Sequence, residues 1–160
     1  MSVENAREYL NKWNRGKDII EMPTSTATVA DAASSLGVIP ARIAKSISLK
    51  NGSSVMIVVA AGDVKIDNKK FKAQFGFKPC MLSPDAAFAA TGYKVGGVCP
   101  FGIPENVDVY LDISMKRFET VFPACGNGNS CIELNLDELN DYSRNKEWID
   151  VCKSIQEETC

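Results

Sequence analysis

Two glycine-rich segments and one lysine have the residue types and spacing that could do chemistry in this chain. The first segment, residues 92–102, contains the pair Gly96 and Gly97. Paired glycines let a ligand approach the backbone closely, and exposed N–H groups there can stabilise an oxyanion. The second segment, residues 126–130, is rich in small donors and acceptors. Each segment taken alone is more typical of a turn, and neither matches the phosphate-binding loop or the dinucleotide fingerprint.

The lysine is Lys45, in the segment Arg-Ile-Ala-Lys-Ser-Ile-Ser, between a predicted short helix and a predicted apolar strand. A single lysine is usually a surface residue. Beside a cleft, however, a lysine could hold a carbonyl oxygen or a phosphate as a point charge. The lysine alone leaves both interpretations open.

The chain contains no histidine. Catalysis by Ser-His-Asp or Cys-His groups, a His-Glu-x-x-His zinc site and a histidine general base are therefore excluded. Hydrolysis of a stable amide or phosphodiester would then need carboxylates, a metal or a lysine. A bond that is already reactive needs less help.

The six cysteines are expected to be mostly reduced thiols. None forms a Cys-x-x-Cys pair, and without histidine a zinc site would need four thiolates at irregular spacing. We therefore expect no metal and no cofactor. Cys80 and Cys131 border apolar runs, which is typical of a cysteine that acts as a small hydrophobe. Cys99 and Cys125 lie in the glycine-rich segments and are the two that could have a chemical role.

The apolar pattern predicts helices and strands that are interspersed along the chain. Helices are predicted over residues 3–13, 29–36, 67–75, 84–92 and 137–152, with a brief one at Pro40. Strands are predicted at 19–22, 46–49, 55–60, 107–113 and 131–134. The second of these strands joins the third through Asn51 and Gly52, the preferred centre of a tight hairpin turn. Residues 55–60 are apolar at every position, which indicates a strand covered on both faces.

A hairpin excludes a purely parallel sheet, so the fold class is α/β with a mixed sheet and helices around it. The 160 residues are the length of one ordinary domain, and we expect a single domain over 1–160. There is no apolar run near the length of a membrane span and no apolar signal-peptide core, so we expect a cytoplasmic protein without a membrane partner. The net charge of −2 makes general nucleic-acid binding, including DNA binding, unexpected.

Charge is nevertheless uneven along the sequence. Between residues 65 and 78 there are five lysines against one acidic residue, Asp67. The cluster fits a solvated helix face, and it also fits a contact with a phosphate backbone, which needs only a local positive field.

Taken together, these residues resemble the YbaK/EbsC family of free-standing aminoacyl-tRNA deacylases, relatives of the editing domain of bacterial prolyl-tRNA synthetases. The resemblance covers about residues 20–142. It runs in order through TSTATVADAASSLGV, ARIAKSISL, VVAAGDVKID, GYKVGGVCPFGIP and FPACGNGNSCIEL. This ordered set is specific, although no single segment would be.

The resemblance implies the fold of that family, a strongly curved mixed β-sheet flanked by helices. It also implies a hydrolase that acts in trans on mischarged tRNA, and we expect a small amino acid on proline tRNA to be the substrate. In the family, the lysine matching Lys45 lines the pocket and supports activity. The Gly-x-x-x-Pro loop, here residues 96–100, contacts the aminoacyl end through its backbone.

We therefore expect Lys45, Gly96 and Gly97 to be the catalytic residues. The residues expected to bind the substrate are Ser25, Thr26, Ser46, Pro100, Asn127, Asn129 and Ser130. The candidates for weak contacts with the body of the tRNA are Lys65, Lys69, Lys70 and Lys72. An aminoacyl-tRNA synthetase that delivers the tRNA is a further candidate partner.

Two alternatives belong to other functional classes: a non-catalytic module of this fold that binds tRNA or a synthetase, and an esterase or amino-acid binder that has lost tRNA. Lys45 and the Gly-x-x-x-Pro loop favour the deacylase. Cys131 stands where the cysteinyl-specific branch has an acidic residue, and the histidine of the alanyl-specific branch is missing. The amino acid that is removed is therefore left open.

Overall fold

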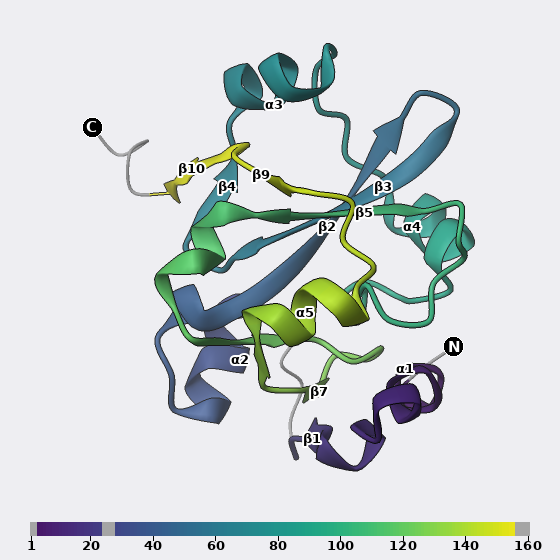
Figure 1. Ribbon diagram of the computed structural model, residues 1–160, viewed down its shortest axis with the longest axis vertical. Helices are drawn as coiled ribbons and strands as arrows, with labels where there is room; N and C mark the ends of the chain where they lie inside the picture. Colours follow the sequence, from purple (N-terminus) through teal and green to yellow (C-terminus); the bar gives the residue numbers. More distant parts are fainter. Residues whose placement is uncertain (1–2, 24–27, 156–160) are drawn as a thin grey trace.

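The computed structural model describes residues 3–23 and 28–155. Its main sheet has the strand order β8–β6–β2–β3–β5–β9 (Figure 1). In that order, the strands are Leu134–Asn135, Thr120–Pro123, Ile43–Asn51, Ser54–Ala61, Asp108–Asp112 and Trp148–Ile149. Two small sheets pair β1 (Ile20–Glu21) with β7 (Ser130–Cys131), and β4 (Val64–Ile66) with β10 (Cys152–Ser154). The α-helices are α1 (Val3–Leu10), α2 (Val29–Leu36), α3 (Asn68–Phe75), α4 (Pro84–Thr91) and α5 (Leu136–Tyr142). Short 3-10 helices are η1 (Asn11–Trp13), η2 (Gly16–Asp18), η3 (Pro40–Arg42) and η4 (Ile113–Arg117).

The β2–β3 hairpin forms the centre of the main sheet. β3 runs antiparallel to β2 and parallel to β5, so the mixed, strongly twisted sheet is confirmed. Residues 56–61 of β3 expose no surface, which confirms a strand covered on both faces. The turn differs by one residue from the prediction. Because Asn51 pairs with Ser54, the two loop residues are Gly52 and Ser53, and Gly52 takes the positive φ of 64°.

Three helices begin and end where the sequence predicts. The N-cap side chain of each accepts a hydrogen bond from a backbone N–H of the first turn, and a glycine with positive φ follows the last turn. The caps are Thr28 for α2, Asp67 for α3 and Ser83 for α4, and the glycines are Gly37, Gly76 and Gly92. These helices are therefore specified locally.

Two predictions near the end of the chain are wrong. The strand predicted over 131–134 is broken into two short strands, because β7 ends at Cys131 and β8 begins at Leu134. The helix predicted over 137–152 ends at Tyr142. Arg144 then takes a φ of 55°, which turns the chain, and residues 148–154 form β9 and β10. The apolar residues after the turn therefore lie in strands and not on a helix face.

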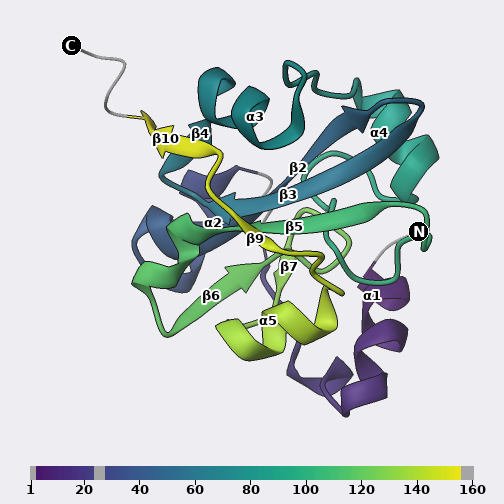
Figure 2. The ribbon, with the colours of Figure 1, turned by 45° about the horizontal axis from the view of Figure 1, so that its top comes forward.

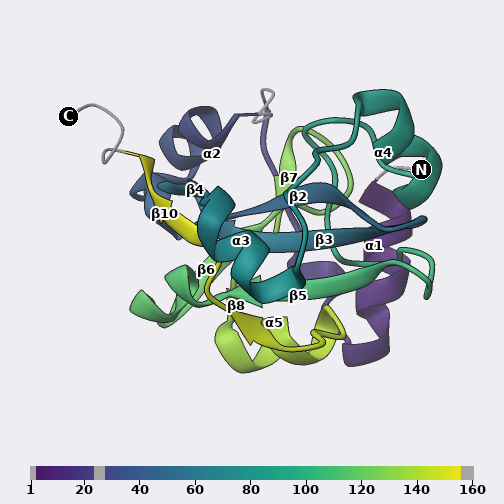
Figure 3. The same cartoon turned by 90° about the horizontal axis from the view of Figure 1, so that it is seen from above.

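Helices lie on both sides of the main sheet and beside the two ends of β2. α3 and α5 lie on opposite sides of the main sheet (Figure 2). α2 and α4 lie beside opposite ends of β2, on the side away from β5 (Figure 3). A small second core joins α2 to β6 and β7 through Met22, Ala32, Ala33, Ile43, Phe122 and Cys131. Within the described ranges, no helix has the length and apolar character needed to cross a membrane.

Candidate active site

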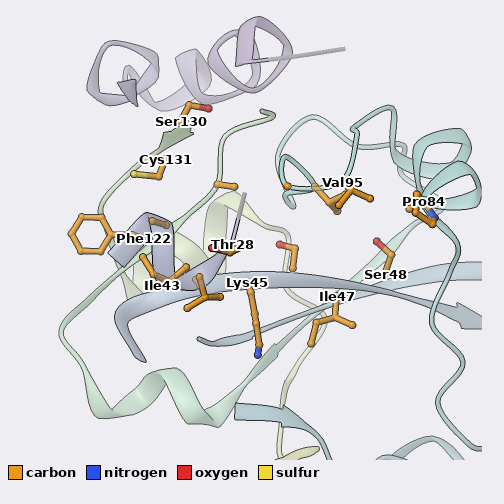
Figure 4. A pocket seen from close by; sticks show the side chains of 18 of the residues that line it. Thr28, Ile43, Lys45, Ile47, Ser48, Pro84, Val95, Phe122, Ser130 and Cys131 are labelled. Carbon is orange, nitrogen blue, oxygen red and sulfur yellow. The ribbon is translucent and has the colours of Figure 1, made fainter. Parts of the chain in front are cut away.

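A pocket of about 310 Å³ lies between β2, α2, the start of α4, residues 95–98 and the β6–β7 region (Figure 4). Most of its lining is apolar, and it includes Ile43 and Phe122 from the second core. Among the described residues, Lys45 is the only lining residue with a charged side chain. The lining hydroxyl groups belong to Thr28, Ser46, Ser48 and Ser130. The described part of the pocket thus offers hydroxyl and backbone groups but no carboxylate.

The outer edge of β2 is covered at both ends and open at Ser46. At one end, β6 pairs with Ile43 and Ala44. At the other end, Ser48 O accepts a hydrogen bond from Leu82 N at 3.1 Å. In a strand, the N–H and C=O groups of alternate residues point to the same edge. Ser46 therefore directs both groups to the edge between these two segments, where no described strand pairs with it.

The Ser46 hydroxyl is also without a partner. Among the described residues, Ser46 Oγ is the only buried side-chain nitrogen or oxygen that forms no hydrogen bond. Leaving a buried hydroxyl unpaired costs about 1–3 kcal/mol. Because Ser46 lines the pocket, a bound molecule could supply the missing hydrogen bond.

The Lys45 side chain leaves β2 in the other direction. Figure 4 shows it extending away from Ser48, Val95 and Ser130. Its Nζ donates to the backbone oxygen of Val64 in β4. Burial lowers the pKa of the Lys45 ammonium, and the nearby Cys152 and Asp63 act in the opposite direction. Lys45 borders the pocket, but its ammonium lies on the opposite side of the strand.

The two predicted catalytic glycines differ in their surroundings. Gly96 lines the pocket with a φ of 90°, and no described group accepts a hydrogen bond from its N–H. Gly97 instead donates its N–H to Lys94 O at 2.9 Å and does not line the pocket. A Cβ atom at Gly97 would lie 2.6 Å from Gly126 O, so this glycine joins the two glycine-rich segments. Its position differs from the expected one of an oxyanion donor.

The polar loop before β7 contributes one side chain to the pocket. Ser130 lines it, and Ser130 Oγ donates to Asn127 Oδ1 at 2.7 Å. Asn129 Nδ2 donates to Met22 O at 2.9 Å, and Met22 N donates back to Asn129 O at 2.7 Å. Asn127 and Asn129 therefore hold the loop and the chain after β1, and neither lines the pocket. Pro100 is buried outside the lining as well.

Several pocket residues had not been singled out from the sequence. Ser25 and Thr26 lie outside the described residues, and Thr28 lines the pocket while it caps α2. Ser48 could have been found, because it lies two residues after Ser46 in a strand and therefore shares its face. Other unforeseen lining residues, among them Met81, Val95 and Phe122, come from separate segments and carry no pattern.

The predicted tRNA-contact lysines lie outside the pocket lining. Lys65 is in β4, while Lys69, Lys70 and Lys72 are in α3. Lys70 Nζ donates to Asp150 Oδ1 and to the backbone oxygen of Cys152, both at 3.1 Å. All three lysines of α3 are exposed, but only Lys70 is engaged in these contacts within the fold.

The five described cysteines are free thiols. Cys80 is exposed, so the prediction that it acts as a buried hydrophobe is wrong, whereas Cys131 is buried as predicted. Burial raises the pKa of Cys99 to about 12 and that of Cys131 to about 11, which makes both poor nucleophiles. Within residues 3–23 and 28–155, no group of Cys, Asp and Glu is placed to hold a metal ion.

The chain is similar to proteins of about its own length and to one part of a much longer protein. It is 54% identical over 154 residues to "Uncharacterized protein YwhH" of Bacillus subtilis, covering 96% of this chain and 98% of that one. It is 31% identical over 130 residues to "Putative Cys-tRNA(Pro)/Cys-tRNA(Cys) deacylase EbsC" of Enterococcus faecalis, covering 80% and 74%. It is 24% identical to the proline--tRNA ligase of Thermotoga maritima, where 99% of this chain spans only 27% of the ligase.

A solved structure has the same fold. The crystal structure titled as "a putative trans-editing enzyme for prolyl tRNA synthetase" superposes with a TM-score of 0.85 at 22% identity, covering 95% of this chain and 97% of the other. The family model of the aminoacyl-tRNA editing domain matches residues 24–142, which include β2, the 95–98 segment and the 126–130 loop. The chain therefore belongs to the aminoacyl-tRNA editing domain family, a family of aminoacyl-tRNA deacylases.

Proposed function

We propose that this editing domain acts in trans, as a free-standing domain, and removes a small amino acid from mischarged proline tRNA. The names of EbsC and of the solved trans-editing enzyme support proline tRNA as the substrate. The apolar lining and the volume of about 310 Å³ fit a small uncharged side chain next to the terminal ribose.

The observation that carries the proposal is the open edge of β2 at Ser46. An aminoacyl ester presents an α-amino group that can donate and a carbonyl oxygen that can accept. The Ser46 C=O, N–H and Oγ offer the complementary set on one residue, and the buried hydroxyl has no partner among the described residues. Binding the aminoacyl end would satisfy groups that residues 3–23 and 28–155 leave unpaired.

The reaction adds water to the ester carbonyl. Backbone N–H groups at the pocket hold the oxyanion that forms, and Gly96 supplies one of them. The bond to the ribose oxygen then breaks, and that oxygen takes a proton, which releases free amino acid and intact tRNA. The chain has no histidine, and no carboxylate of the described residues lines the pocket, so in this proposal the neighbouring ribose hydroxyl of the tRNA orients the water.

In this arrangement Lys45 does not touch the substrate but holds β2, the strand that carries Ser46, in place. Its bond to Val64 O ties β2 to β4 behind Ser46. Contact of its ammonium with the ester oxygen or the terminal phosphate, as the resemblance implies, would require that bond to open. Either role predicts that Lys45→Ala lowers kcat/KM, by an amount on the order of 2–4 kcal/mol in transition-state stabilisation.

The proposal extends to location and partners. We place the protein in the cytoplasm, where tRNA is charged. The exposed lysines of α3, Lys69 and Lys72, together with Lys65, would give the tRNA body a weak, salt-sensitive contact. With a net charge of −2, the chain attracts tRNA little, so a synthetase that hands over the mischarged tRNA completes the proposal.

The test is a deacylation panel. Proline tRNA is charged separately with alanine, cysteine, serine and proline, and ester loss is followed with catalytic amounts of the wild type, Lys45→Ala and Ser46→Ala. We expect rapid loss of one or two esters with the wild type and strongly slowed loss with both variants. Proline on its own tRNA should be spared.

Survival of every ester, while mischarged tRNA still binds, would instead support the non-catalytic binding module. Hydrolysis of simple amino-acid esters at a rate that added tRNA does not change would support the small-molecule esterase. Tm measurements on each variant separate loss of function from loss of folding.

A further inference from the structure

Two exposed apolar side chains border the pocket, and the mechanism above does not use them. Among the large apolar side chains of the described residues, Met81 and Val95 are the most exposed, at 66% and 65%. Both line the pocket. Apolar surface left exposed beside a pocket is typical of a ligand-binding surface.

Both side chains stand on backbone that is fixed. Met81 forms a β-bridge with Leu49, next to the hydrogen bond from Lys50 N to Cys80 O at 2.9 Å. Val95 lies inside the turn closed by the bond from Gly97 N to Lys94 O. The folded backbone therefore holds both side chains exposed at the pocket.

Positive charge accompanies the two apolar side chains. Lys50 shares the face of β2 that carries Ser46 and Ser48, and Lys94 immediately precedes Val95. Both lysines are exposed, and within the described chain neither forms a salt bridge. One acidic residue, Asp85 in the first turn of α4, is also nearby in the chain. The surface thus combines apolar contact with a net positive charge.

We propose that Met81 and Val95 clamp the base of the terminal nucleoside of the tRNA, and that Lys50 and Lys94 attract the phosphate on its 5′ side. The proposal rests on the proposed function, because ester and base belong to the same nucleoside. With the ester carbonyl at Gly96, the base lies one ribose ring away, and Val95 is the adjacent residue. A methionine thioether and an aliphatic side chain both pack well against a flat aromatic ring.

The experiment compares two RNA substrates with three enzymes. An acceptor-stem minihelix ending in CCA and the same minihelix with an abasic terminal ribose are aminoacylated chemically with the amino acid that the wild type removes fastest. The enzymes are the wild type, Met81→Ala with Val95→Ala, and the control Ile113→Ala, an exposed apolar residue of η4 outside the pocket.

We expect the wild type and Ile113→Ala to prefer the base-bearing ester by about tenfold in kcat/KM, mainly through KM. The double variant should lose this preference and hydrolyse the abasic ester at the wild-type rate. The clamp is overturned if the double variant lowers kcat/KM equally for both esters. It is also overturned if the double variant still prefers the base-bearing ester. In both cases the proposed function stands. If the wild type hydrolyses no mischarged RNA at all, the proposed function fails, and the clamp fails with it.

Discussion

A Cβ atom on Gly97 would lie 2.6 Å from Gly126 O and 2.7 Å from Asn127 N. Such distances mean that the backbones of the two glycine-rich segments are in direct contact. The contact joins residues 95–98, which border the pocket on one side, to the loop that ends at Ser130 on the other. Pocket shape therefore depends on the absence of a side chain at this one position.

Gly97→Ala should separate the two segments. The atoms that the new methyl group meets are backbone atoms, which cannot rotate away as a side chain could. We expect a loss of about 1–3 kcal/mol in the free energy of unfolding, measured by urea denaturation. kcat/KM for mischarged tRNA should fall as well, because Gly96 moves with its neighbour.

Gly76→Ala is the matched control for Gly97→Ala. Gly76 has a φ of 84°, and a Cβ there would meet nothing within 4 Å. This variant should lose about 1–2 kcal/mol of stability through backbone strain alone. Its kcat/KM should stay at the wild-type value, and an equal loss of activity in both variants would show that the Gly97 contact has no specific role.

Ser46→Ala should change stability and activity in opposite directions. The substitution removes a buried hydroxyl that has no partner among the described residues, so we expect stability to rise by up to about 1–3 kcal/mol. Turnover of mischarged tRNA should fall, because the substrate loses a hydrogen-bonding group. Ser53→Ala, at an exposed serine of the β2–β3 loop outside the pocket, should be close to neutral in both measurements. A Ser46→Ala enzyme of normal activity would remove this residue from the site.

Lys45 should make stability rise with pH in the alkaline range. Burial lowers the pKa of Lys45 below its ordinary value of 10.5, so between these two values the unfolded chain binds more protons than the folded one. The cost of burying the ammonium is fully present below the folded-state pKa and is relieved as pH rises toward 10.5.

The comparison for this prediction is Lys45→Met. The free energy of unfolding of the wild type minus that of the variant should become more positive as pH increases toward 10.5. Urea denaturation at several pH values measures this difference. A difference that does not change with pH would contradict the buried position of the ammonium.

The lysines of α3 can be tested through salt. Lys69→Glu with Lys72→Glu should raise KM for mischarged tRNA and reduce the salt dependence of log KM by a slope of about one to two. Lys70 is left intact, because a glutamate there would face Asp150 and disturb the fold. An unchanged KM would mean that these lysines form only a solvated helix face.

The local elements were predictable from the sequence because their signals are local. Thr28 and Gly37 mark the two ends of α2, and the apolar run 55–60 identifies a covered strand. The helix predicted over 137–152 failed for the opposite reason. What ends it after Tyr142 is the turn at Arg144 and the pairing of Trp148 and Ile149 with β5, a tertiary contact that no local pattern reveals.

The site was predictable in part. The resemblance directed attention to Ser46, Gly96 and Ser130, and all three line the pocket. Because side chains alternate along a strand, Lys45 and Ser46 leave β2 on opposite sides. The strand was predicted to begin at Ser46, so this alternation was not applied to Lys45. Met81 and Val95 could not be singled out, because the fold alone brings their segments to the same pocket.

The pairing of β2 has a consequence for how the pocket responds to fluctuation and to mutation. Pairing with β3 extends from Ala44 to Asn51, so the amide protons of Lys45 and Ile47 should exchange with solvent only when the whole protein opens. The N–H groups of Val95 and Gly96 donate to no described group, so their amide protons should exchange without opening of the whole protein. One wall of the pocket is thus as persistent as the fold itself, while an exposed side chain of the other wall, such as that of Val95, can be replaced at little cost to folding.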